Sequence, residues 1–100
     1  MSHVLRWLPE AVLDLARVRD FIRINNPDAA ARAAKRIIEA VQKLRAHPLI
    51  GRPVVDIERP KLRDLFIPFG QAGYYGRYTV TEDEIIMVRI WHSRENRIVF

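Results

Sequence analysis

One apolar segment near the C-terminus decides the fold of this chain: Glu84-Ile85-Ile86-Met87-Val88-Arg89-Ile90-Trp91-His92-Ser93-Arg94-Glu95. Most of it is typical of a β-strand, in which side chains point alternately to opposite faces of the sheet. One face then carries Ile86, Val88 and Ile90. The other carries Met87, Arg89 and Trp91. We expect the first set in a core and the second on an open face that meets a partner.

Two more strand candidates precede this segment, at residues 62–69 and 73–80. The links between the three, residues 70–73 and 81–83, are short enough for hairpin turns, so we expect an antiparallel meander. In the strand at 73–80, one face carries Tyr74, Tyr78 and Val80, and the other carries Tyr75, Arg77 and Thr79. The strand at 62–69 is ambiguous, because Arg63 has the same parity as Leu65 and Ile67.

The first half of the chain predicts a short strand at residues 3–8 and a pair of helices. Pro9 suits the first turn of one helix, and Asn26 with Pro27 suits the start of the next, which ends before Pro48. The short link between them implies an antiparallel hairpin. Residues 52–61 are expected to form a loop. The fold class is therefore α+β, in the order β-α-α-β-β-β, as one domain over residues 1–100, with the helical hairpin covering one face of a mainly antiparallel sheet.

Charge and composition limit the kinds of partner. The chain has 100 residues, no cysteine and a net charge of +5, which favours an anionic partner such as nucleic acid or an acidic protein. The excess of arginine over lysine has two open explanations, namely phosphate or carboxylate recognition and the codon bias of a GC-rich genome. No segment is long and apolar enough for a membrane helix, so we expect no membrane partner and a location in the cytoplasm.

The candidate chemistry is narrow. No set of residues has metal-ligand spacing and no phosphate-binding glycine loop is present, so we expect no metal and no cofactor. His92 is the one credible acid or base, and Arg63, Arg77, Arg89 and Arg94 are candidates to stabilise phosphate charge in a metal-independent RNA cleavage. The alternative for His92 is a strand-end residue paired with Glu95 or a carbonyl. The alternative for the arginines is an ordinary solvated sheet face.

Several short motifs in order resemble one family. They are Pro9-Glu10-Ala11, Asn26-Pro27-Asp28, Gly51-Arg52-Pro53, Leu62-Arg63-Asp64-Leu65, Ile67-Pro68-Phe69-Gly70, Arg77-Tyr78 and His92-x-Arg94-Glu95. Their sequence and spacing resemble the RelE/ParE superfamily of bacterial toxins across nearly the whole chain. The resemblance implies the toxin half of a type II toxin–antitoxin pair, a plasmid-stabilisation system in which a cognate antitoxin neutralises the toxin.

The resemblance also implies two possible targets. ParE-like toxins poison DNA gyrase and cut no bond themselves, whereas RelE-like toxins are ribosome-dependent mRNA endonucleases. We expect target binding through Arg63, Arg77, Arg89, Trp91 and Arg94. The family's antitoxins wrap the helical hairpin and the sheet. In this chain that implies contacts with Leu13, Phe21 and Ile24, which the predicted core stripe leaves spare.

Departures from the RelE pattern favour the ParE reading. Ser93 follows His92 where RelE-type nucleases often have tyrosine, Lys61 is the one lysine near the meander, and the terminal aromatic residue, Phe100, has no hydroxyl. A ParE-like gyrase poison is therefore our first hypothesis. A RelE-like nuclease and a catalytically inert nucleic-acid-binding module are the alternatives.

Overall fold

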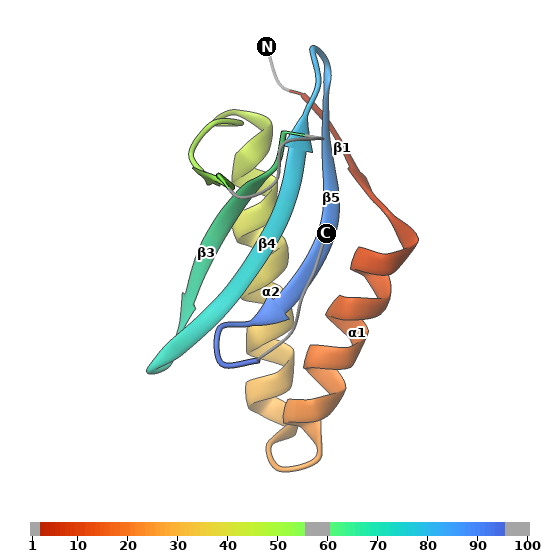
Figure 1. Ribbon diagram of the computed structural model, residues 1–100. Coiled ribbons are helices and arrows are strands. Elements are labelled where there is room, and N and C mark those ends of the chain that lie inside the picture. Colours follow the sequence, from red (N-terminus) through yellow and green to blue (C-terminus); the bar gives the residue numbers. More distant parts are fainter. Residues whose placement is uncertain (1–2, 56–60, 96–100) are drawn as a thin grey trace.

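The computed structural model describes residues 3–55 and 61–95, and Figure 1 shows a two-helix hairpin packed against one face of a curved sheet. The elements are β1 (Val4–Trp7), α1 (Pro9–Arg23), α2 (Pro27–Gln42), the short 3-10 helix η1 (Lys43–Arg45), β2 (Arg52–Pro53), β3 (Arg63–Phe69), β4 (Ala72–Val80) and β5 (Glu84–His92). Their order confirms the predicted α+β class. The prediction that residues 52–61 form only a loop is wrong at its start, where Arg52–Pro53 form the short strand β2. Residues 56–60 and Phe100 lie outside the described part.

The sheet has the strand order β1-β5-β4-β3-β2. Strands β2 to β5 pair antiparallel, as the short links from β3 to β4 and from β4 to β5 predict for those pairs. Strand β1 pairs parallel with the first half of β5, from Val4 opposite Glu84 to Trp7 opposite Met87. A parallel pair needs a long crossover, and the helical hairpin supplies it. The second half of β5 therefore extends beyond β1 and meets α1, which is where the polar network described below is built.

Local signals in the sequence explain the two helices. The Asn26 side chain accepts a hydrogen bond of 3.0 Å from the Ala29 main-chain N–H, and Pro27 occupies the first turn, as predicted for a capped start. Helix α1 begins after Leu8, which provides no side-chain cap. The hairpin buries small or aliphatic side chains against the sheet: Ala11, Val18, Ala30, Ala33, Ile37 and Val41. No helix in the described ranges is both long and apolar enough to span a membrane.

A β-bulge in β5 corrects the predicted face assignment. Arg77 lies opposite Arg89 but Tyr78 lies opposite Met87, so Val88 is an extra residue on β5. An extra residue reverses the alternation of side chains before and after it. Ile85, Met87 and Ile90 are consequently buried in the core, and the prediction that Ile86 and Val88 enter it while Met87 faces out is wrong. Beyond the bulge the prediction agrees with the register, because Ile90 faces the helices and Trp91 the other side.

Tyr78 links the core to the loop that follows η1. Its ring is fully buried, and its hydroxyl donates to the Pro48 carbonyl and accepts from the Gly51 N–H, each at 2.8 Å. Burial raises the pKa of Tyr78, which outweighs the opposing effects of the Gly51 N–H and Arg63, so the hydroxyl keeps the proton that it donates. Gly51 has no room for a side chain, because an added Cβ would lie 2.6 Å from the Tyr78 hydroxyl.

We expect Tyr78→Phe to lower the free energy of unfolding by about 2 kcal/mol, because the buried Gly51 N–H and the Pro48 carbonyl lose their partner. Urea denaturation measures the loss. Tyr75→Phe, on the open face of the same strand, is the matched control and is expected to change it by less than about 0.5 kcal/mol. Equal losses in the two variants would show that the Tyr78 hydroxyl does not hold the loop.

Candidate functional site

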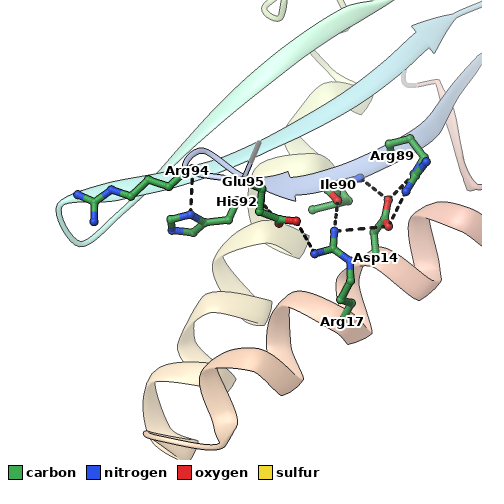
Figure 2. A network of polar contacts seen from close by, with 7 residues as sticks. All are labelled: Asp14, Arg17, Arg89, Ile90, His92, Arg94 and Glu95. Carbon is green, nitrogen blue, oxygen red and sulfur yellow. Dashed lines mark hydrogen bonds and ion pairs between the residues drawn. The ribbon is translucent and has the colours of Figure 1, made fainter. Parts of the chain in front are cut away.

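The exposed edge of β5 is completed by two side chains from α1 (Figure 2). Asp14 Oδ2 accepts a hydrogen bond of 2.9 Å from the Ile90 N–H, and Arg17 Nη2 donates one of 3.1 Å to the Ile90 carbonyl. These are the two groups that a neighbouring strand would have satisfied. The pair Asp14 and Arg17, one helical turn apart, thus takes the place of a missing strand and fixes α1 against β5.

The same two residues also bind side chains that lie before and after Ile90 in the chain. Arg89 Nε and Nη2 donate to the Asp14 carboxylate at 2.7 and 3.1 Å, which is the two-pronged geometry that suits guanidinium and carboxylate. Arg17 Nη1 donates to Glu95 Oε2 at 2.7 Å. A chain of alternating charges therefore runs from Arg89 through Asp14 and Arg17 to Glu95 (Figure 2).

The electrostatics of Asp14 follow from these contacts. Burial alone would raise its pKa, but the hydrogen bonds from Arg89 and the Ile90 N–H, together with the positive charges of Arg89 and Arg17, lower it below its ordinary value. The hydrogen bond that Arg89 donates to Asp14 likewise raises the pKa of Arg89 against the effect of its burial. Asp14 is therefore a buried carboxylate that stays ionised because cations surround it.

His92 lies in the turn that ends β5. Its Nδ1 accepts a hydrogen bond of 3.1 Å from the Arg94 N–H, and its own main-chain N–H donates to Glu95 Oε1 at 2.7 Å. Accepting at Nδ1 places the imidazole proton on Nε2. The ring meets Tyr74 edge-on, with centroids 5.2 Å apart. Residues 92–95 thus form a closed turn. The ion pair between Glu95 and Arg17 fixes this turn against α1.

A cavity of about 700 Å³ opens between this turn and α1. Val18, Phe21 and Ile22 form its helical wall, and Phe69 and Tyr74 form its sheet wall. Arg17, His92, Arg94 and Glu95 are its polar lining. Burial and the Glu95 charge raise the pKa of Tyr74. Within residues 3–55 and 61–95, no three His, Cys, Asp or Glu side chains are grouped closely enough to hold a metal ion. The cavity suits an apolar side chain with a polar group at its edge.

The comparisons with known proteins agree with this fold. Residues 5–97 match the family model for the ParE toxin of the parDE type II toxin–antitoxin system. The chain belongs to this family.

Proteins that are similar to this chain carry either RelE or ParDE in their names. Toxin RelE3 of Caulobacter vibrioides is 34% identical over 89 residues, which cover 89% of this chain and 92% of that protein. Toxin RelE1 of the same organism is 36% identical over 85 residues, covering 79% and 87%. A solved structure titled as the chromosomal ParDE system of P. aeruginosa superposes with a TM-score of 0.73 at 26% identity, covering 91% of this chain and 96% of that one. This chain is thus a type II toxin of the RelE/ParE superfamily.

Three arginines predicted to face a target are engaged within the toxin itself. Arg77 is 8% exposed and donates to both carboxylate oxygens of Asp64, at 2.8 and 3.0 Å. Arg89 is bound to Asp14, as described above. Arg63 Nη1 donates to the carbonyls of Leu49 and Gly51 at 3.1 and 2.8 Å. Arg63 therefore lies on the sheet face that the helices cover, the question that the sequence pattern left open. Arg77 lies on the face away from the helices, as predicted, but it is buried against Asp64, and Arg89, predicted on the same open face, is bound instead to Asp14 on α1.

The remaining predicted residues are separated by the sheet. Arg94 is exposed at the cavity, whereas Trp91 lies on the face away from the helices, stacked on Tyr75 with centroids 5.5 Å apart. Leu13, Phe21 and Ile24 are 69%, 75% and 83% exposed along α1. Sequence reasoning missed Asp14, Arg17 and Tyr74. Asp14 had a signal, because a carboxylate there interrupts the apolar stripe of Ala11 and Leu15.

Proposed function

We propose that this toxin acts by binding and poisoning DNA gyrase in the cytoplasm, and that a cognate antitoxin neutralises it. The observation that supports a binding protein over a nuclease is the internal pairing of Arg63, Arg77 and Arg89. Cleavage of RNA without a metal needs cations that are available to the phosphorane and an acid and base beside them. Here three of the four candidate cations, Arg63, Arg77 and Arg89, are bound to carboxylates or carbonyls of the same chain.

The position of His92 supports the same reading. Its Nδ1 is occupied by the Arg94 N–H, and its ring faces Tyr74 and the cavity on the helix side. Arg77 lies on the other face, with its guanidinium 5.1 Å from the centre of the Trp91 ring. His92 and Arg77 are therefore divided by the sheet, although Arg94 lies on the side of His92.

The antitoxin proposal draws on α1. Leu13, Phe21 and Ile24 form an exposed apolar stripe, here called the α1 face, and Phe21 also lines the cavity beside Arg17 and Arg94. An apolar stripe with arginines along it suits an amphipathic, acidic segment, as does the net charge of +5. The similarity to a ParDE toxin–antitoxin system of P. aeruginosa supports an antitoxin as the partner.

A RelE-like ribosome-dependent endonuclease is the second candidate. Two observations favour it: the relatives in Caulobacter vibrioides carry RelE names, and the cavity brings His92 together with Tyr74, Arg17 and Arg94. A histidine, a tyrosine and two cations are groups from which an acid–base site is built.

The deciding experiment expresses the toxin without its antitoxin and follows gyrase cleavage complexes, plasmid supercoiling and ribosome-bound mRNA in parallel. We expect trapped gyrase complexes and intact mRNA. We also expect His92→Gln to remain toxic, whereas loss of a general acid or base would reduce cleavage by about 100-fold or more. Thermal unfolding of the variant checks that its fold is kept. Codon-phased mRNA cuts with gyrase untouched, abolished by His92→Gln, would refute the gyrase proposal.

A further inference from the structure

The loop after η1 presents two aliphatic side chains to solvent while its main chain is tied down. Leu49 and Ile50 are 63% and 56% exposed. Beneath them, Tyr78 bonds to Pro48 and Gly51, and Arg63 bonds to the carbonyls of Leu49 and Gly51. Two side chains of the sheet thus hold the backbone of this loop. Apolar groups on a fixed backbone lose little entropy on binding, which is the property of a preorganised contact.

The exposed loop continues into the face of the sheet that the helices leave uncovered. Ile50 and Phe66 together line two adjoining hollows of about 600 and 670 Å³, one toward α2 and one toward Tyr75 and Trp91. Phe66 lies 5.2 Å from Tyr75, and Tyr75 lies 5.5 Å from Trp91, measured between ring centroids. Ile50, Phe66, Tyr75 and Trp91 therefore make one surface, here called the loop–sheet patch, and Leu49 precedes Ile50 in the chain.

The chemistry of this patch fits protein better than nucleic acid. A platform for single-stranded nucleic acid needs aromatic ring faces that are open to the bases. Here Tyr75 and Trp91 stack on each other, Arg77 covers part of Trp91, and the Arg77 charge is matched by Asp64. Its exposed apolar area comes from Ile50 and Phe66, which are 56% and 46% exposed.

The rim of the patch is cationic. Arg36 and Lys43 on α2 border one hollow with Glu39, and Arg52 borders the other. All four of these side chains belong to exposed residues. An apolar centre with a rim of excess positive charge is complementary to an apolar anchor surrounded by carboxylates.

We propose that the loop–sheet patch is the surface by which this toxin holds its target, and that the target is a protein presenting an aliphatic or aromatic side chain among acidic residues. The proposal rests on the proposed function, in which the toxin acts by binding a protein. It places target and antitoxin on different surfaces, because the patch lies on the open sheet face and against the border of α2, whereas the α1 face lies on the other helix. Toxicity and antitoxin binding are then separable by mutation.

The test compares Ile50→Asp with Val55→Asp. Val55 is an exposed aliphatic residue just beyond β2, five positions from Ile50, and it does not line the hollows, so its variant is the control. Both variants and the parent toxin are measured for binding to the DNA gyrase holoenzyme, to the cognate antitoxin and to a short single-stranded RNA. We expect Ile50→Asp to bind gyrase at least 30-fold more weakly, as for a central contact of an interface, and Val55→Asp to bind it like the parent. Antitoxin affinity and melting temperature should be the same in all three.

The remaining outcomes separate this proposal from the proposed function. If the parent binds gyrase and Ile50→Asp binds it equally well, the patch is not the contact surface although the function stands. If gyrase is not bound and mRNA is cut, the proposed function fails, and loss of RNA binding in Ile50→Asp then identifies a nucleic-acid surface and overturns the patch proposal too. A parent toxin that binds neither gyrase nor RNA also overturns it.

Discussion

Replacing Asp14 by alanine is expected to lower the free energy of unfolding by about 3 kcal/mol, the lower end of what breaking a buried ion pair costs. The variant loses the two bonds to Arg89 and leaves the Ile90 N–H without its acceptor. The cost is at the lower end because the Arg89 side chain is 23% exposed and water can partly take the place of the carboxylate. Denaturant unfolding measures the loss.

Asp20→Ala is the matched control on the same helix. The Asp20 side chain is 48% exposed and its contacts with Arg19 and Arg23 are 3.4 and 3.5 Å long, so we expect a change below about 0.5 kcal/mol. The double variant Asp14→Ala with Arg89→Ala should cost less than the sum of the two single changes, because the residues share one interaction. Additive losses would mean that the pair does not act as a unit.

The Asp14 carboxylate makes the stability of the parent depend on pH in a way that the stability of Asp14→Ala does not. The folded-state pKa of Asp14 is lowered, so its contribution is fully present above the unfolded-state pKa and is lost as pH falls through the folded-state pKa. The stability advantage of the parent over Asp14→Ala should be constant from neutral pH down to about 5 and shrink below about 4, where the unfolded carboxyl begins to bind its proton. An advantage that shrank between pH 8 and 6 would contradict the assignment to Asp14.

Much of the fold could be predicted because its signals are local. The cap at Asn26, the prolines at helix starts and the short links of the meander each act within a few residues, and the resemblance to a toxin family agrees with them. The bulge at Val88 could not be predicted in this way. Ile85 and Ile86 are equally apolar, so the pattern is compatible with either register, and only the core contacts of Met87 decide between them.

Only part of the candidate site could be predicted, because its contacts join residues that are far apart in the sequence. Sequence reasoning could identify arginines on the meander as unusual, but it could not find what they bind. Asp14 is separated from Arg89 by 75 positions, and the cross-strand pairing of Asp64 with Arg77 depends on register. An arginine that is expected from the sequence to face solvent can therefore be paired with a carboxylate of the same chain. For this reason we propose partner binding through the α1 face and the loop–sheet patch and not through these arginines.

Phe21→Asp is expected to weaken antitoxin binding by at least 100-fold, the second large effect. Phe21 is the aromatic member of the α1 face and borders the cavity, so it combines the size and position of a central interface contact. A carboxylate there would also face an acidic partner. Because the side chain is 75% exposed in the isolated toxin, the melting temperature should change little. Titration calorimetry of the purified toxin with its cognate antitoxin gives the affinity.

Val12→Asp supplies the control on the same helix. Val12 is 51% exposed and precedes Phe21 by nine positions, which is about two and a half helical turns, so the two side chains point to opposite sides of α1. Both variants add the same charge to the same element and differ only in the face that carries it. If α1 docks the antitoxin through Leu13, Phe21 and Ile24, Val12→Asp keeps its affinity and Phe21→Asp loses it. Equal affinities would place the antitoxin elsewhere, and the exposed stripe would need another partner.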